Sequence, residues 1–187
     1  GHATVVTGTT PNDHGIIGND WFNPSLGKEV YCVDDFFKKS VGTSTDEGKK
    51  SPKNLQTTTI SDENRISTNF KAKTFSVALK DRSAVLSAGH TSDMTYWFNA
   101  KNEGRFITSS YYMDELPDWV ESFNDRSNIF KYISKWDTYY NIKLYTESGP
   151  DLNKHEIKYL GKENSTFPHD LEKISKKKNG KIDYDVI

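Results

Sequence analysis

The chain has 187 residues, and its 25 Lys and Arg against 26 Asp and Glu give a formal net charge of −1. Such a balance provides no global field that would draw the protein to nucleic acid or to an anionic membrane. No apolar run approaches the ~20 residues of a membrane span, and the single cysteine excludes an internal disulfide. The length suits one domain with a sizeable core, and the 13% aromatic content indicates that aromatic side chains supply much of it.

The first twenty residues combine a candidate helix with turn-forming residues. Small and β-branched residues in 1–10 favour a helix start packed against a sheet, and 11–15 holds Pro, Asn, Asp and Gly, which each favour a bend. A short apolar strand interrupted by Gly18 follows. It places Asn19 where the backbone comes close to a ligand, and the amide of this side chain offers two donors and one acceptor.

Polar residues and turn formers dominate 27–54, which predicts a flexible surface excursion. After it, Thr59 followed by the acidic Asp62 and Glu63 reads as a capped helix start. Ile66 and Phe70 are four positions apart, so we expect them to share the buried face of that helix.

The stretch 75–79 reads as a short buried strand that runs directly into three charged residues. Lys80 and Arg82 are two apart, so on an extended backbone their side chains leave on the same side. An ammonium and a planar guanidinium fork suit the oxygens of a phosphoryl group. Alone, this triplet would more often be a solvated turn.

The following elements are less charged and rich in aromatic residues. Strand-like residues on both sides of a turn at 102–104 predict a β-hairpin. The remaining predictions are a strand at 94–98 and its partner at 105–108, helices at 116–123 and 127–136, and a strand at 142–145.

Several separated blocks of this sequence resemble one family. GHATVVTGTTPNDHGIIGNDW at 1–21 is similar to the alkaline phosphatase superfamily, in the branch with a threonine nucleophile that includes nucleotide pyrophosphatase/phosphodiesterases. SVALKDRSAVLSAGHTSDMTYWF at 76–98 is similar to the phosphomonoesterases of that branch. The resemblance implies an α/β fold, a partial alkaline-phosphatase-like sandwich with short helices, a β-hairpin region and the polar excursion at 27–54.

The resemblance also implies an activity and a set of site residues. The whole protein would hydrolyse phosphate monoesters with two zinc ions and a phospho-threonine intermediate, in the periplasm or outside the cell. Asn19, Lys80 and Arg82 match the positions that contact phosphoryl oxygens in the family. The nucleophilic threonine is expected just upstream of Gly1, so no catalytic residue is assigned within this chain.

Other candidate residues favour structural roles. Asp151 and His155 have the spacing of two zinc ligands in the family, but they follow a polar stretch instead of an apolar strand, so we assign no metal ligand here. His2 and His14 are expected to be hydrogen-bonded framework residues. Cys32 is expected to be buried. The basic run at 173–181 lacks interleaved aromatics, which favours a solvated surface over a nucleic-acid contact.

We therefore expect 1–187 to be an internal fragment of one alkaline-phosphatase-like domain that is inactive and binds no zinc alone. Its partner would be a small-molecule phosphate ester. An exposed sheet edge, with apolar surface around 96–98, would allow self-association. Two alternatives stay open, namely a nucleotide pyrophosphatase/phosphodiesterase and a non-catalytic binding or structural module.

Overall fold

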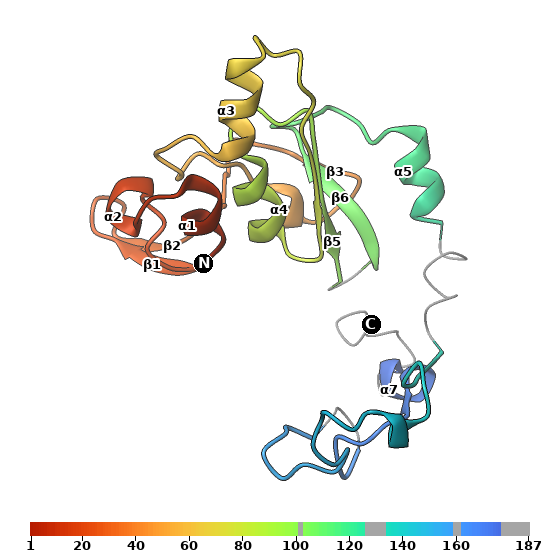
Figure 1. The fold of residues 1–187 in the computed structure, drawn as a ribbon. Coiled ribbons are helices and arrows are strands. Elements are labelled where there is room, and N and C mark those ends of the chain that lie inside the picture. The colour runs from red at the N-terminus through yellow and green to blue at the C-terminus, as the bar shows by residue number, and fades with distance from the viewer. Residues whose placement is uncertain (101–102, 126–133, 159–161, 177–187) are drawn as a thin grey trace. The chain divides into compact units, whose positions relative to one another are not determined.

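The computed structural model describes residues 1–100, 103–125, 134–158 and 162–176 (Figure 1). The chain divides into two compact units, each with its own internal contacts. The first unit consists of Gly1–Asn99 and Arg105–Ser122, and the second of Ala100–Gly104 and Phe123–Ile187. In the described residues no helix has both the length and the apolar character that a bilayer crossing needs.

A four-stranded mixed sheet in the order β3-β6-β5-β4 forms the centre of the first unit. The strands are β3 (Ser40–Val41), β4 (Phe75–Ala78), β5 (Met94–Asn99) and β6 (Arg105–Ser109). β4 and β5 are parallel, and the helix α4 (Asp81–Ala88) connects them, as a crossover between parallel strands requires. β5 and β6 form the predicted antiparallel hairpin. The mixed α/β class expected from the sequence is confirmed.

Helices cover the sheet from both sides (Figure 1). α4 packs on β4 and β5 through its apolar side, where Ala84, Val85 and Leu86 are buried. On the other side of the sheet, Trp119 of α5 (Asp118–Phe123) meets Tyr96 edge to face, with ring centroids 5.6 Å apart. Each face of the sheet therefore has its own apolar cluster.

The N-terminal residues form α1 (His2–Thr7), α2 (Pro11–His14) and an antiparallel hairpin of β1 (Asp20–Asn23) and β2 (Lys28–Tyr31). The helix expected near the N-terminus is confirmed, but it packs on α4 instead of on the sheet. Figure 1 shows α1 beside α4.

The expectation that 27–54 is a surface excursion is wrong, because the segment is part of the packed unit. It contributes β2, β3 and the 3-10 helix η1 (Asp46–Gly48), and Lys50 and Ser51 are buried. The Lys50 ammonium lies 2.5 Å from Asp34 Oδ1, and the Ser51 hydroxyl donates to Asp35 Oδ2 at 2.6 Å. Polar composition was misleading here because the buried polar groups are paired with each other.

The strand at 75–79 is also less buried than predicted. β4 ends the sheet order, and Phe75 and Val77 are about three-fifths exposed, at 61% and 62%. Tyr96 and Trp97, where exposed apolar surface was expected, are buried on the neighbouring strand instead. At this edge of the four-stranded sheet, the exposed apolar residues are therefore on β4. Self-association through an exposed sheet edge stays a prediction.

The helix α3 (Ile60–Ser67) is capped by Thr59 as predicted, with a capping box between Thr59 and Asp62. The predicted buried pair is wrong, since Ile66 and Phe70 are both about half exposed. The reason is that the helix stops before Phe70, whose φ of 59° lies in the left-handed region. The four-residue spacing therefore does not place the two side chains on one helical face.

The second unit contains short elements. β7 (Lys135–Trp136) pairs antiparallel with β8 (His169–Asp170), and α7 (Leu171–Ser175) follows. The strand predicted at 142–145 is wrong: the segment is a 3-10 helix, η2 (Ile142–Leu144), because the Asn141 side chain accepts the Lys143 amide hydrogen and closes a turn. Most of the helix predicted at 127–136 lies outside the described residues, and its last two residues are β7.

Asp62 is the most heavily used buried carboxylate of the first unit among the described residues. Its oxygens accept hydrogen bonds from the Thr59 and Thr91 amides and hydroxyls and from the His90 amide, at 2.8 to 3.2 Å. Gly89 has no Cβ, and one there would collide with this carboxylate. Burial raises the pKa of Asp62, but the hydrogen bonds outweigh it and leave this pKa below its ordinary value.

We expect Asp62→Asn to lower the free energy of unfolding by about 2–4 kcal/mol at neutral pH, because buried donors lose a charged acceptor. A pKa that is lower in the folded state adds stability above the unfolded value of ~3.9, and this is lost as the pH falls through the folded value. Denaturant unfolding at several pH values measures the difference between the two proteins, which should shrink below pH ~4. The exposed control Asp114→Asn should change little. A difference that stays constant down to pH 2 would contradict this account.

Candidate functional site

A cavity of about 250 Å³ lies where α1, α2 and the first turn of α4 meet the start of the β1–β2 hairpin. Side chains far apart in the sequence line it, and the lining includes Gly18, Asn19, Cys32, Arg82 and Leu86 together with residues of α1 and α2. Two of the three predicted phosphate contacts, Asn19 and Arg82, are therefore on the wall of one cavity.

Asn19 is an exposed residue whose backbone is hydrogen-bonded. Its carbonyl accepts the Cys32 amide hydrogen at 2.8 Å, which extends the β1–β2 hairpin by one bond. The residue directly precedes β1, so the hairpin fixes the position from which the amide group projects. That Asn19 lies close to a ligand stays a prediction.

Arg82 lies in the first turn of α4, and its guanidinium is held in place. Nη1 donates to the Tyr31 hydroxyl oxygen at 3.1 Å, and the backbone amide of Arg82 donates to Asp81 Oδ1 at 2.6 Å. The hydrogen bond to Tyr31 raises the pKa of Arg82, so the guanidinium keeps its charge. A fixed cation on the cavity wall can pair with an anionic ligand.

The geometric argument for Lys80 is wrong in one respect. Lys80 is extended, with φ −110° and ψ 134°, and it caps α4, but Arg82 is already helical. Strand alternation therefore does not send the two side chains to the same side. Lys80 is exposed and is not among the residues that line the cavity, whereas Arg82 is.

His14 has the framework role predicted for it. The ring is buried, its Nδ1 accepts the Ile16 amide hydrogen at 3.1 Å, and its Nε2 lies 3.1 Å from the Thr4 hydroxyl. An acceptor Nδ1 leaves the proton on Nε2 in the neutral ring, so Nε2 donates to Thr4. His14 thereby ties α2 to α1 beside the cavity. His2 also lines the cavity, from the exposed side of α1.

Cys32 is buried as predicted, and it lines the same cavity. Burial, with a smaller contribution from the negative charge of Asp81, raises the pKa of the Cys32 thiol to about 11. At neutral pH the thiol therefore stays protonated, which is the inert form.

We expect Cys32 to react with a thiol-specific reagent at pH 8 about 100-fold more slowly in the folded chain than in denaturant, because both the thiolate fraction and the access are low. The chain has a single cysteine, so the absorbance of the released chromophore reports this site alone. Equal rates in the two conditions would show that the cavity wall is open at this position.

No group of three or more His, Cys, Asp or Glu side chains that could hold a metal ion occurs in the described residues. In the spaced pair, the Asp151 carboxylate has a backbone partner, and His155 is exposed. Asp151 Oδ2 accepts the Phe167 amide hydrogen at 3.1 Å, and the His155 backbone amide donates to Asn153.

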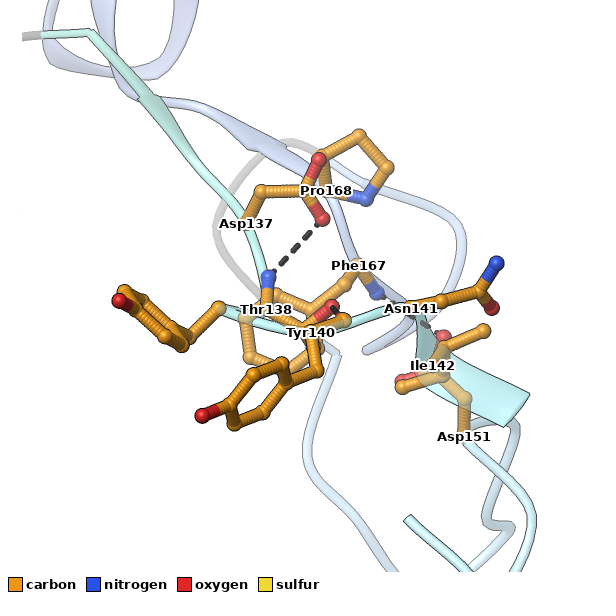
Figure 2. Close-up of a pocket in the computed structure, with 9 residues that line it drawn as sticks. Asp137, Thr138, Tyr140, Asn141, Ile142, Asp151, Phe167 and Pro168 are labelled. Carbon is orange, nitrogen blue, oxygen red and sulfur yellow. Dashed lines mark hydrogen bonds between the residues drawn. The ribbon is translucent and has the colours of Figure 1, made fainter. Parts of the chain in front are cut away.

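A second cavity, of about 400 Å³, lies in the second unit, and sequence reasoning did not anticipate it (Figure 2). Its lining comes from 137–142, from Asp151 and from the Phe167–Pro168 segment. The two carboxylates on its wall are engaged with backbone amides, Asp137 with Thr138 at 2.9 Å and Asp151 with Phe167. It includes none of the predicted site residues.

Comparison with known proteins places the chain in a family. The family described as type I phosphodiesterase / nucleotide pyrophosphatase matches residues 1–179. Alkaline phosphatase PhoV of Synechococcus elongatus is 48% identical over 90% of this chain and 31% of its own length. A protein named calcium-transporting ATPase from Myroides odoratus is 41% identical over 96% of this chain and 33% of its own length.

Alkaline phosphatase PafA of Elizabethkingia meningoseptica is 42% identical over 97% of this chain and 34% of its own length. Its wild-type crystal structure superposes on 92% of this chain with a TM-score of 0.84 at 42% identity. A further PafA structure is of a variant substituted at one threonine, one asparagine, one lysine and one arginine. The chain spans about a third of the length of these relatives. It belongs to the type I phosphodiesterase / nucleotide pyrophosphatase family.

Proposed function

We propose that the whole protein hydrolyses phosphate monoesters, and that Asn19, Lys80 and Arg82 contact the phosphoryl oxygens. The observation that carries the proposal is the shared cavity: Asn19 before β1 and Arg82 in α4 line the same wall although the whole of 20–81 separates them. An amide donor and a fixed guanidinium on one wall suit an oxyanion.

The relatives support the same substrate class. PhoV and PafA are named alkaline phosphatases. In the substituted PafA variant the lysine and the arginine are two positions apart, as Lys80 and Arg82 are. The asparagine precedes that lysine by almost the same distance along the chain that separates Asn19 from Lys80.

Charge distinguishes a monoester from a diester. A dianionic monoester carries one more negative charge on its phosphoryl oxygens than a diester, whose second ester group neutralises it. Two cations placed beside these oxygens therefore favour the monoester in the transition state. Arg82 is on the cavity wall, and the long stem of the exposed Lys80 would have to bring its ammonium to the substrate from the first residue before α4.

The threonine nucleophile, the two zinc ions and a periplasmic or secreted location belong to this proposal as features implied by the family. The described residues gather no metal-ligand set. In the whole protein the ions would supply charge stabilisation and activation of the nucleophile. The residues of this chain would bind and orient the phosphoryl group.

Phosphodiester hydrolysis is the second candidate, because the matching family is described as type I phosphodiesterase / nucleotide pyrophosphatase. A diester site requires less positive charge beside the non-transferred oxygens than a monoester site. The contribution of Lys80 and Arg82 to each reaction therefore separates the two candidates.

Replacing Lys80 and Arg82 by Ala in the whole protein should lower kcat/KM for an aryl monoester far more than for the matched diester. Each lost charged hydrogen bond is worth about 2–4 kcal/mol in the transition state, or ~30- to 1000-fold in rate. The measurement is steady-state kinetics on the two substrates with the same leaving group.

The double variant Lys49→Ala with Arg105→Ala is the matched control. Like the test variant it removes one lysine and one arginine, but these two form ion pairs with Asp46 and Glu121. Equal losses on both esters in the Lys80 and Arg82 variant would favour the phosphodiesterase. No turnover of either ester by the unaltered protein would favour a non-catalytic binding module.

A further inference from the structure

The Tyr31 hydroxyl lies between the two residues that begin α4. It donates to Asp81 Oδ1 at 2.6 Å and accepts from Arg82 Nη1 at 3.1 Å. The same Asp81 oxygen accepts the backbone amide of Arg82 at 2.6 Å. The three groups form a closed loop that holds Arg82 at its backbone and at its guanidinium, so the side chain has few alternatives to its observed direction.

The protons in this loop have a defined arrangement. Burial, followed by the hydrogen bond to Asp81, raises the pKa of Tyr31 far above the neutral range, so the phenol stays neutral and donates. A neutral hydroxyl oxygen can then accept from the guanidinium without cancelling its charge. Four of the five N–H groups of Arg82 are not used by this contact, and they include the fork that pairs with an oxyanion.

A buried lysine balances the charge of Asp81. The Lys50 ammonium lies 3.6 Å from Asp81 Oδ2 and 2.5 Å from Asp34 Oδ1, and it stands 4.9 Å from the centroid of the Tyr31 ring. Lys50 is 8% exposed, so this pairing occurs away from solvent. Two carboxylates and the cations Lys50 and Arg82 make the cluster neutral as a set. Because Lys50 faces Asp81, Arg82 does not have to serve as its ion-pair partner.

We infer that Tyr31 is a positioning residue for Arg82, whose guanidinium it holds toward the cavity through a neutral hydroxyl while Lys50 compensates Asp81. This inference rests on the proposed function, because it assigns Arg82 to an anionic phosphoryl group. It predicts that loss of one hydroxyl, which touches no substrate, weakens only the part of catalysis that Arg82 supplies.

A double-mutant cycle with Tyr31→Phe and Arg82→Ala in the whole protein tests the inference. Phe keeps the ring that packs against Lys50 and removes only the hydroxyl. We expect Tyr31→Phe to lower kcat/KM for an aryl monoester about tenfold, to lower it less for the matched diester, and to weaken inhibition by inorganic phosphate. In the Arg82→Ala background the same substitution should have no further effect.

Tyr111→Phe is the matched control, because it removes a hydroxyl of the same unit that donates to the His90 carbonyl oxygen at 2.9 Å, outside the cavity lining. Denaturant unfolding verifies that each variant is folded. If Arg82→Ala itself costs nothing on either ester, the proposed function fails and the inference falls with it. If Arg82→Ala has its expected effect but Tyr31→Phe acts equally in both backgrounds, or not at all, only the inference is overturned.

Discussion

The first unit depends on the pairing of one carboxylate, that of Asp81, at the point where strand β4 becomes helix α4. Asp81 accepts the Tyr31 hydroxyl and the Arg82 amide, and Lys50 lies close to its second oxygen. Tyr31 ends the β1–β2 hairpin, and Lys50 comes from the polar segment that follows it, so this carboxylate connects parts of the chain that are distant in sequence. The same connection determines where Arg82 points and which residues share its cavity.

Burying several charges together costs free energy unless each charge has a partner. This cost explains why the charged groups around Lys50 are paired one with another. Lys50 is paired with Asp34, and Ser51 with Asp35, beside the apolar residues Cys32 and Val33. The buried carboxylate of Asp62 is satisfied in a different way, by backbone amides and hydroxyls of Thr59 and of Thr91, which follows α4. Polar pairs therefore fix the ends of α4, while its apolar side packs on the sheet.

Sequence reasoning predicted the parts of the fold that local chemistry determines. The Thr59 cap, the hairpin of β5 and β6, the hydrogen-bonded framework role of His14 and the burial of Cys32 depend on short-range chemistry, and all four are confirmed. It did not predict the burial of Lys50, because the carboxylates that compensate its charge are distant in sequence and approach it only in the folded chain. It also places Lys80 and Arg82 on one extended segment, because three consecutive charged residues hide the start of α4, whose N-cap is Lys80 and whose first residue is Asp81. Asn19 and Arg82 were paired through family resemblance, and their shared cavity supports that pairing. Tyr31 carries no sequence signal for its role, since the hydroxyl acquires it only by its position beside α4.

The central claim is that this cavity receives a phosphoryl group between Asn19 and Arg82. The most direct measurement is a crystal structure of the whole protein with inorganic phosphate. The account predicts phosphate oxygens within ~3 Å of the Asn19 amide nitrogen and of the Arg82 guanidinium, with Nη1 of Arg82 still on the Tyr31 hydroxyl. Phosphate bound elsewhere in the protein, or Arg82 turned away from the bound anion, would contradict it.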